Sequence, residues 1–151
     1  MIDTNNKIND LKQFLGDTLQ FTDAELNIIK TCMNYIHEQA PVEIPLIILK
    51  TNNLISASED LAWICLSVNR KINEIEANIK RIKAPEFTAL TRQGRPSTMA
   101  IEYEILYNHD ELSDMEETLG TLQKFYDYLK HLEKSIDRYL WMLRDSGNFN
   151  K

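Results

Sequence analysis

A row of apolar residues that recurs every three or four positions constrains this chain more than any other feature of its sequence. The row comprises Leu61, Cys65, Val68, Ile72, Ile75, Ile79 and Ile82. Such alternating intervals place all of these side chains on one face of an α-helix, as in the seam of a coiled coil. We call these seven residues the heptad seam. No strong helix breaker lies between Pro45 and Pro85, so the sequence predicts a helix over 45–83, roughly 58 Å long at 1.5 Å per residue.

A helix of that length extends beyond one compact globule of 151 residues, so its apolar face needs a partner helix. A long antiparallel helical hairpin within a monomer satisfies this requirement, and so does an oligomeric coiled coil. Both arrangements remain open from the sequence, and we favour a homo-oligomer of unspecified stoichiometry. The residues that we expect at the oligomer interface are Leu61, Val68, Ile72, Ile75, Ile79 and Ile82.

The first 44 residues predict two shorter helices. Thr22 can cap a helix while Glu25, three residues on, reaches back to it, which is the pattern of a capping box. Apolar residues at helical spacing continue this helix to about Gln39. A shorter helix is predicted before it, with Gly16 near its end.

A second long helix is predicted from His109 to Arg144, with a stop at Asp145–Gly147 because Gly147 suits the left-handed position after a helix. Between the long helices, Pro85, Gly94 and Pro96 predict a loop over 84–97, and a short helix follows over 98–107. The expected fold is all-α. It has an N-terminal helical segment (1–44) and a helical hairpin with a basic loop (45–151), which together form one structural domain.

Sequence signals of catalysis and of metal binding are absent. Thr91–Pro96 contains one glycine and lacks the spacing of a phosphate-binding loop. Cys32 and His37 are five residues apart, which places them on different sides of a helix turn and makes a zinc pair improbable. The acids of His109–Glu111 are better explained by the dipole of the helix that starts there than by acid–base catalysis. We therefore expect no enzyme, no metal and no cofactor.

The cysteines and the hydropathy pattern bear on location. Cys32 and Cys65 lie in apolar helical surroundings, as expected of buried free thiols in a reduced compartment. The longest apolar run, Ile44–Leu49, is interrupted by Pro45 and is far shorter than the roughly 20 residues that span a bilayer. The first twenty residues are polar and contain no signal-peptide core. We expect a cytoplasmic protein with no membrane partner.

The charged residues are unevenly distributed. The chain has a net charge of −6, yet residues 70–95 contain seven Lys or Arg against three Asp or Glu, while residues 102–117 contain seven acids and no base. This pattern predicts a basic tip at the end of the first long helix, although a solvated helix end would show the same spacing. The predicted nucleic-acid contacts are Lys80, Arg81, Lys83, Arg92 and Arg95, with Phe87 stacking on a base.

The segment Arg95-Pro96-Ser97-Thr98-Met99-Ala100-Ile101-Glu102-Tyr103-Glu104-Ile105-Leu106 is similar to an element of small phage proteins, K/R-P-T/S-x-x-A-I-E-x-E-V/I-L. There the element follows a Lys/Arg-rich helix and precedes a long helix that ends in R-x-x-M-L or a close variant. Here that end reads Asp137-Arg138-Tyr139-Leu140-Trp141-Met142-Leu143-Arg144. From Leu61 onward the layout resembles the UvsY-like recombination mediators of tailed phages. The chain departs from them in lacking a basic stretch after the last helix.

The resemblance implies an all-helical homo-oligomer that binds single-stranded DNA. It also implies that the protein helps to load a RecA-like recombinase onto strands coated with single-strand-binding protein. By position, the DNA-binding bases of that family match Lys80, Arg81 and Lys83, with Arg92 and Arg95 in the loop. The alternative is a non-enzymatic helical assembly or virion component, or a host-directed interaction protein, in which the hairpin serves only as an interaction surface.

Overall fold

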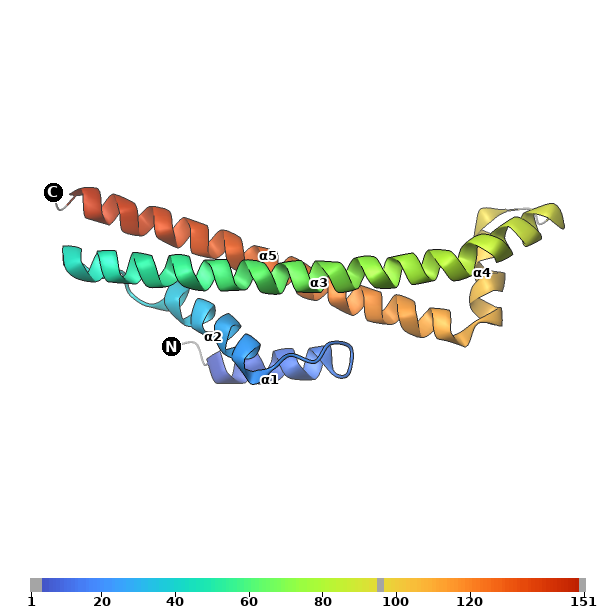
Figure 1. Cartoon of the computed structure of the whole chain (residues 1–151), viewed down its shortest axis with the longest axis horizontal. Coiled ribbons are helices and arrows are strands. Elements are labelled where there is room, and N and C mark those ends of the chain that lie inside the picture. Colours follow the sequence, from blue (N-terminus) through green and yellow to red (C-terminus); the bar gives the residue numbers. More distant parts are fainter. Residues whose placement is uncertain (1–3, 95–96, 150–151) are drawn as a thin grey trace.

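The computed structural model describes residues 4–94 and 97–149, with side chains up to residue 145. These residues form five helices and no strand (Figure 1). The helices are α1 (Thr4–Leu15), α2 (Asp23–His37), α3 (Ile44–Arg92), α4 (Thr98–Asn108) and α5 (Asp110–Phe149). The all-α fold expected from the sequence is confirmed.

Helices α3 and α5 run antiparallel along the length of the molecule and form a long hairpin (Figure 1). Helix α4 crosses the end of the hairpin where α3 finishes, and contacts both long helices. Helices α1 and α2 pack on one side of the hairpin, where α2 contacts both α3 and α5. The core therefore extends as a strip along the α3–α5 contact and widens beneath α2.

The heptad seam is buried inside this hairpin. Leu61 and Val68 have no exposed surface, and Ile75 is 9% exposed. Helix α5 supplies the opposing apolar residues, among them Leu122 and Leu129, which are fully buried. Burying each such side chain contributes about 1.5–3 kcal/mol. Of the two arrangements left open by the sequence, the structure shows the antiparallel hairpin within one chain.

The burial of the heptad seam bears on the oligomer interface that the sequence predicts. Leu61, Val68, Ile72, Ile75 and Ile79 are buried in the single chain, and Ile82 is partly buried against the same core. Five of the six are thus largely covered within one chain, while Ile82 keeps part of its surface exposed. Association between copies stays a prediction.

The N-terminal helices start and stop near the expected positions. The capping box of α2 is confirmed, because the Glu25 backbone N–H donates to Thr22 Oγ1 at 3.2 Å and the Thr22 backbone N–H donates to Glu25 Oε1 at 3.3 Å. Helix α2 ends at His37, two residues before the expected Gln39. Gly16 ends α1 with a φ of +51°, a conformation that favours glycine.

The expected loop from residue 84 to 97 is wrong over most of its length, because α3 continues through Pro85 to Arg92. Proline removes one backbone hydrogen bond and crowds the preceding turn, but packing can compensate. Phe87 and Leu90 lie two and five residues after Pro85, at positions partly buried against the core. The hydroxyl of Thr91 also donates to the Phe87 carbonyl at 2.7 Å, within the extended part of the helix.

The expected stop at Asp145–Gly147 is also wrong, because α5 continues to Phe149. Glycine lowers helix stability by only about 1 kcal/mol relative to alanine. It permits a helix end without requiring one, so the backbone of a long, well-packed helix can continue past it.

Both cysteines are buried free thiols, as expected. The thiol of Cys32 donates to the Ala57 carbonyl at 3.6 Å. Burial raises the pKa of Cys32 to about 11 and that of Cys65 to about 12. Nucleophilic attack requires the thiolate, so both residues act as small core side chains that join α2 to α3 and α3 to α5.

The continuation of α3 through Pro85 can be tested by replacing the proline. Pro85→Ala should raise the free energy of unfolding by about 1–3 kcal/mol, because it restores a backbone hydrogen bond and removes the ring clash. Urea unfolding followed by circular dichroism measures the change. Pro45→Ala is the matched control and should be close to neutral, since proline is tolerated in the first helical turn. If Pro85→Ala were neutral or destabilising, residues 84–92 would not be helical in solution.

Candidate nucleic-acid interface

The continuation of α3 aligns three exposed arginines, which the sequence pattern divides between the predicted helix 45–83 and the predicted loop 84–97. Arg70, Arg81 and Arg92 are separated by intervals of eleven residues. Eleven residues are about three turns of an α-helix, so the three guanidinium groups share one face at intervals of roughly 16 Å. We call these three residues the arginine row. Lys80, also exposed, lies beside its middle member.

An exposed tryptophan lies on the same side of α3. Trp63 precedes Arg70 by seven residues, which is about two turns, and 71% of its surface is exposed. A large apolar ring held this far into solvent is uncommon on a folded chain. It offers a flat face at one end of the arginine row.

The row is available to an anion. Among the residues that the structure describes, no carboxylate lies within ion-pair distance of Arg70, Arg81, Arg92 or Lys80. Two acids lie four residues from a member of this set: Glu74 lies 4.0 Å from Lys71, and Glu76 accepts a hydrogen bond from Gln123 at 3.4 Å. Four cationic side chains therefore extend from α3 without an internal counter-ion.

Lys83 and Phe87, two of the predicted nucleic-acid contacts, lie against other parts of the chain. Lys83 donates to Glu116 of α5 at 2.5 Å, and its side chain is 25% exposed. The returning helix thus gives Lys83 a carboxylate partner within the chain. Phe87 is half-buried and packs against the core. Nucleic-acid contact by these two residues stays a prediction. Arg95 lies outside the described residues.

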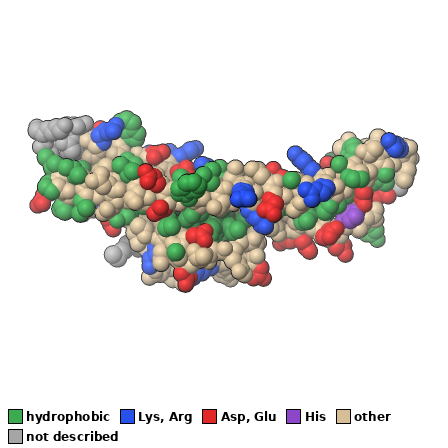
Figure 2. Space-filling model, viewed as in Figure 1, with side chains coloured by type: hydrophobic (Ala, Val, Ile, Leu, Met, Phe, Trp, Pro, Cys, Tyr) green, Lys and Arg blue, Asp and Glu red, His purple; other side chains and the backbone are tan. Residues whose placement is uncertain are grey.

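The end of the hairpin is not a basic tip. Antiparallel pairing brings the start of α5 beside the end of α3, and α4 packs between them. Residues 80–117 together contain five Lys or Arg against eight Asp or Glu. Figure 2 shows the acids of this end along the α5 edge and the bases on the α3 side. The described bases of this end thus all lie on α3, with the acids of α4 and α5 beside them.

His109 and Glu86 form a contact that no local sequence pattern predicts, and it joins α3 to the junction between α4 and α5. His109 Nε2 hydrogen-bonds to Glu86 Oε1, and His109 Nδ1 lies 3.9 Å from Glu111 Oε1. The residue lies between α4 and α5, where its backbone N–H donates to the Ile105 carbonyl at 3.1 Å. Its side chain therefore fixes the α4–α5 junction to α3. Only the continuation of α3 past Pro85 places Glu86 on a helix at this position.

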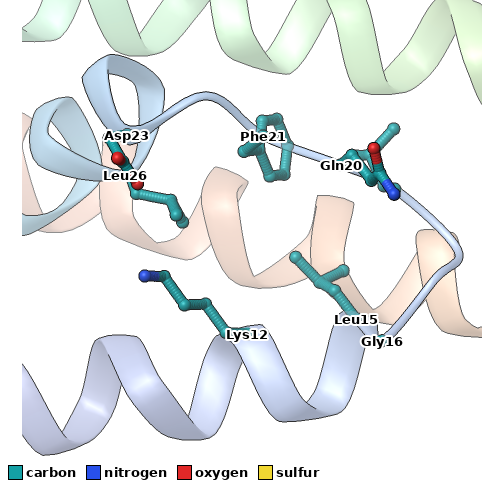
Figure 3. A pocket seen from close by; sticks show the side chains of 8 residues that line it. Lys12, Leu15, Gly16, Gln20, Phe21, Asp23 and Leu26 are labelled. Carbon is teal, nitrogen blue, oxygen red and sulfur yellow. The ribbon is translucent and has the colours of Figure 1, made fainter.

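One hollow of the surface lies beneath the loop between α1 and α2, where Leu15, Phe21 and Leu26 point into a common space (Figure 3). Lys12 and Asp23 are the charged residues among the eight that line it. Phe21 also packs against Phe125 of α5, with ring centroids 5.4 Å apart, so this site serves the attachment of α1 and α2 to the hairpin.

Two further findings concern the residues described by the structure. No three His, Cys, Asp or Glu side chains among them converge as the ligands of a metal ion would. None of their helices contains an apolar stretch long enough to cross a bilayer.

Comparison of this chain with protein-family models, with curated proteins and with solved structures finds no match. The likeness to the UvsY-like mediators therefore stands on the residues quoted for it.

The contact between His109 and Glu86 can be tested by a double-mutant cycle. His109→Ala should lower the free energy of unfolding by about 1 kcal/mol, because it removes a half-exposed contact between α3 and the α4–α5 junction. In the Glu86→Ala background the same change should cost less, which urea unfolding of the four variants measures. His131→Ala, at an exposed position of α5, is the control. Strictly additive effects of the two substitutions would show that the pair does not act as one contact.

Proposed function

We propose that this chain is a non-enzymatic helical protein that binds single-stranded nucleic acid along the arginine row. The observation that carries the proposal is the alignment of Arg70, Arg81 and Arg92 on one unbroken helix, without internal counter-ions. Arginine is suited to phosphate because its planar guanidinium donates two parallel hydrogen bonds. Contacts of this kind hold a strand in position and are insensitive to its sequence.

Trp63 supports a single-stranded ligand over a duplex. Bases of a single strand are free to stack on an aromatic ring, whereas the bases of a duplex are already stacked on one another. A flexible strand can also follow a straight helix over the roughly 44 Å between Trp63 and Arg92. Trp63 takes the stacking role that the sequence reading gave to Phe87.

A more specific proposal is that the chain acts as a phage recombination mediator, as the resemblance to the UvsY-like family implies. In this role the arginine row holds single-stranded DNA. The acidic edge formed by α4 and the start of α5 engages a RecA-like recombinase, and single-strand-binding protein is displaced from the same strand. The separation of bases on α3 from acids on α5 supports two different partners on one molecule.

The arginine row predicts a specific salt dependence. Replacing Arg70, Arg81 and Arg92 together with Ala should weaken binding to a single-stranded oligonucleotide at least tenfold at moderate salt. It should also reduce the slope of log K against log salt by about 2, since each phosphate contact on a single strand contributes about 0.7. Fluorescence anisotropy at several salt concentrations measures both quantities.

The matched control removes the same charge from another helix. Lys124, Lys134 and Arg138 are exposed on α5, and their replacement with Ala should leave the slope almost unchanged. Equal losses in the two triple variants would mean that only net charge matters. In that case the arginine row would not be the binding site.

Trp63 predicts a change of a different kind. Trp63→Ala should weaken single-strand binding by about 1–3 kcal/mol, while the salt slope stays the same because no phosphate contact is lost. Trp141→Ala is the control, since this second exposed tryptophan lies on α5. Unchanged affinity of the Trp63→Ala variant would remove the stacking role and leave a purely electrostatic interface.

A second candidate function is that of a helical assembly or interaction protein. The observation that favours it is the exposure of several large apolar side chains near the start of α3 and the end of α5, including Ile48, Leu49 and Trp141. Absence of single-strand binding by the native chain at low salt, with the fold intact, would favour this candidate over nucleic-acid binding.

A further inference from the structure

A second apolar row runs along α3, outside the buried core. Ile44, Ile48, Ile55 and Leu66 are between 39% and 59% exposed. Their intervals of four, seven and eleven residues are close to whole numbers of helical turns, so the four side chains share one face of α3. We call these four residues the outer apolar row. The heptad seam lies on a different face of the helix and is already covered by α5.

The outer apolar row continues onto α5. Ile55 lines a groove with Thr51 of α3 and with Leu140 and Trp141 of α5. Trp141 is 62% exposed there. Together with the outer apolar row it exposes on the order of 500 Å² of apolar surface, as large as the largest patch on a typical monomer. Figure 2 shows apolar side chains gathered at this end of the molecule.

The order of residues on α3 indicates what covers this surface. Ile44 and Leu66 lie eleven residues before and after Ile55, while Ile48 and the exposed Ala62 lie seven residues before and after it. With Ala62 included, the exposed apolar positions of this face are symmetric about Ile55. If a second copy packs antiparallel on it, Ile55 meets the partner's Ile55, and Ile44 meets the partner's Leu66. Such self-complementarity is what a two-fold interface requires, whereas an unrelated partner imposes no symmetry.

The charged residues of the groove are also compatible with a two-fold interface. Asp137 and Arg144 line it, two turns apart on α5. Arg144 lies over the ring of Trp141 at 5.2 Å, and Asp137 has no ion pair among the described residues. In a two-fold interface each copy has to supply both signs of charge from one patch. Glu59, exposed four residues after Ile55 on the same face, adds a second acid to the patch. In an antiparallel register centred on Ile55, Glu59 lies opposite the partner's Thr51, so the two copies do not oppose like charges on α3.

We propose that a second copy of this chain packs antiparallel against the outer apolar row, with the two-fold axis beside Ile55. The dimer covers the start of α3 and the end of α5, and directs the two hairpin tips in opposite directions. Arg70, Arg81 and Arg92 lie beyond Leu66 and stay exposed, whereas Trp63 lies within the stretch of α3 that the dimer covers. The arginine row is therefore accessible in the dimer, and the interface can be tested without nucleic acid.

Site-specific cross-linking tests both the surface and its register. The Ile55→Cys variant, treated with a short bismaleimide, should give a covalent dimer in high yield because the two introduced thiols meet at the axis. The Leu66→Cys variant alone should give little dimer, but a mixture of Ile44→Cys and Leu66→Cys chains should cross-link. The native cysteines are buried, so the unsubstituted chain serves as the background control.

Sedimentation gives the second measurement. The native chain should be a dimer at tens of micromolar, and Ile55→Lys should raise the dissociation constant at least tenfold. Met99→Lys is the matched control, because Met99 is 67% exposed on α4, away from the row. A monomeric native chain, an unchanged dimer with Ile55→Lys, or equal cross-linking of the Leu66→Cys variant alone would each overturn the proposal. Cross-linking at Ile55→Cys decides the matter even if Ile55→Lys fails to fold.

Discussion

Burial of the heptad seam between α3 and α5 is the contact on which the rest of the structure depends. Without the returning helix, α3 would expose a continuous apolar face from Leu61 to Ile82, and so long a helix would not be stable alone in water. The same contact forms the surface on which α2 docks, and α1 attaches through α2 and α5. The antiparallel direction of α5 then determines which charged residues meet at the end of the hairpin.

That direction accounts for the electrostatics of the molecule. The acids of 102–117 return alongside the bases that end α3, and two contacts form across the gap: Lys83 with Glu116, and Glu86 with His109. These side chains have partners within the chain. On the outer face of α3, by contrast, Arg81 and its neighbours have no carboxylate within ion-pair distance among the described residues. Hairpin formation thus divides the basic segment into a structural part and an exposed part.

Helix α3 also carries two distinct surfaces at different positions along its length. Near its start the outer apolar row lies beside a groove shared with α5, and further along the arginine row follows Trp63. Both rows follow one helix that is unbroken from Ile44 to Arg92. A helix of 49 residues can therefore present one surface to a second copy of the chain and another to a nucleic acid strand, and the two surfaces adjoin at Trp63.

The sequence by itself determined the helical class, the heptad seam, the capping box of α2, the short helix after Ser97 and the buried thiols, because each follows from local spacing or residue type. It left open what covers the seam, since a second copy and a returning helix bury apolar surface equally well. The tertiary structure decided three points that no local pattern contains. Packing of Phe87 and Leu90 carries α3 past Pro85, the return of α5 gives Lys83 and Glu86 their partners, and the unbroken helix places Arg92 in line with Arg70. These outcomes depend on residues distant in sequence, whose contacts exist only once the hairpin has closed.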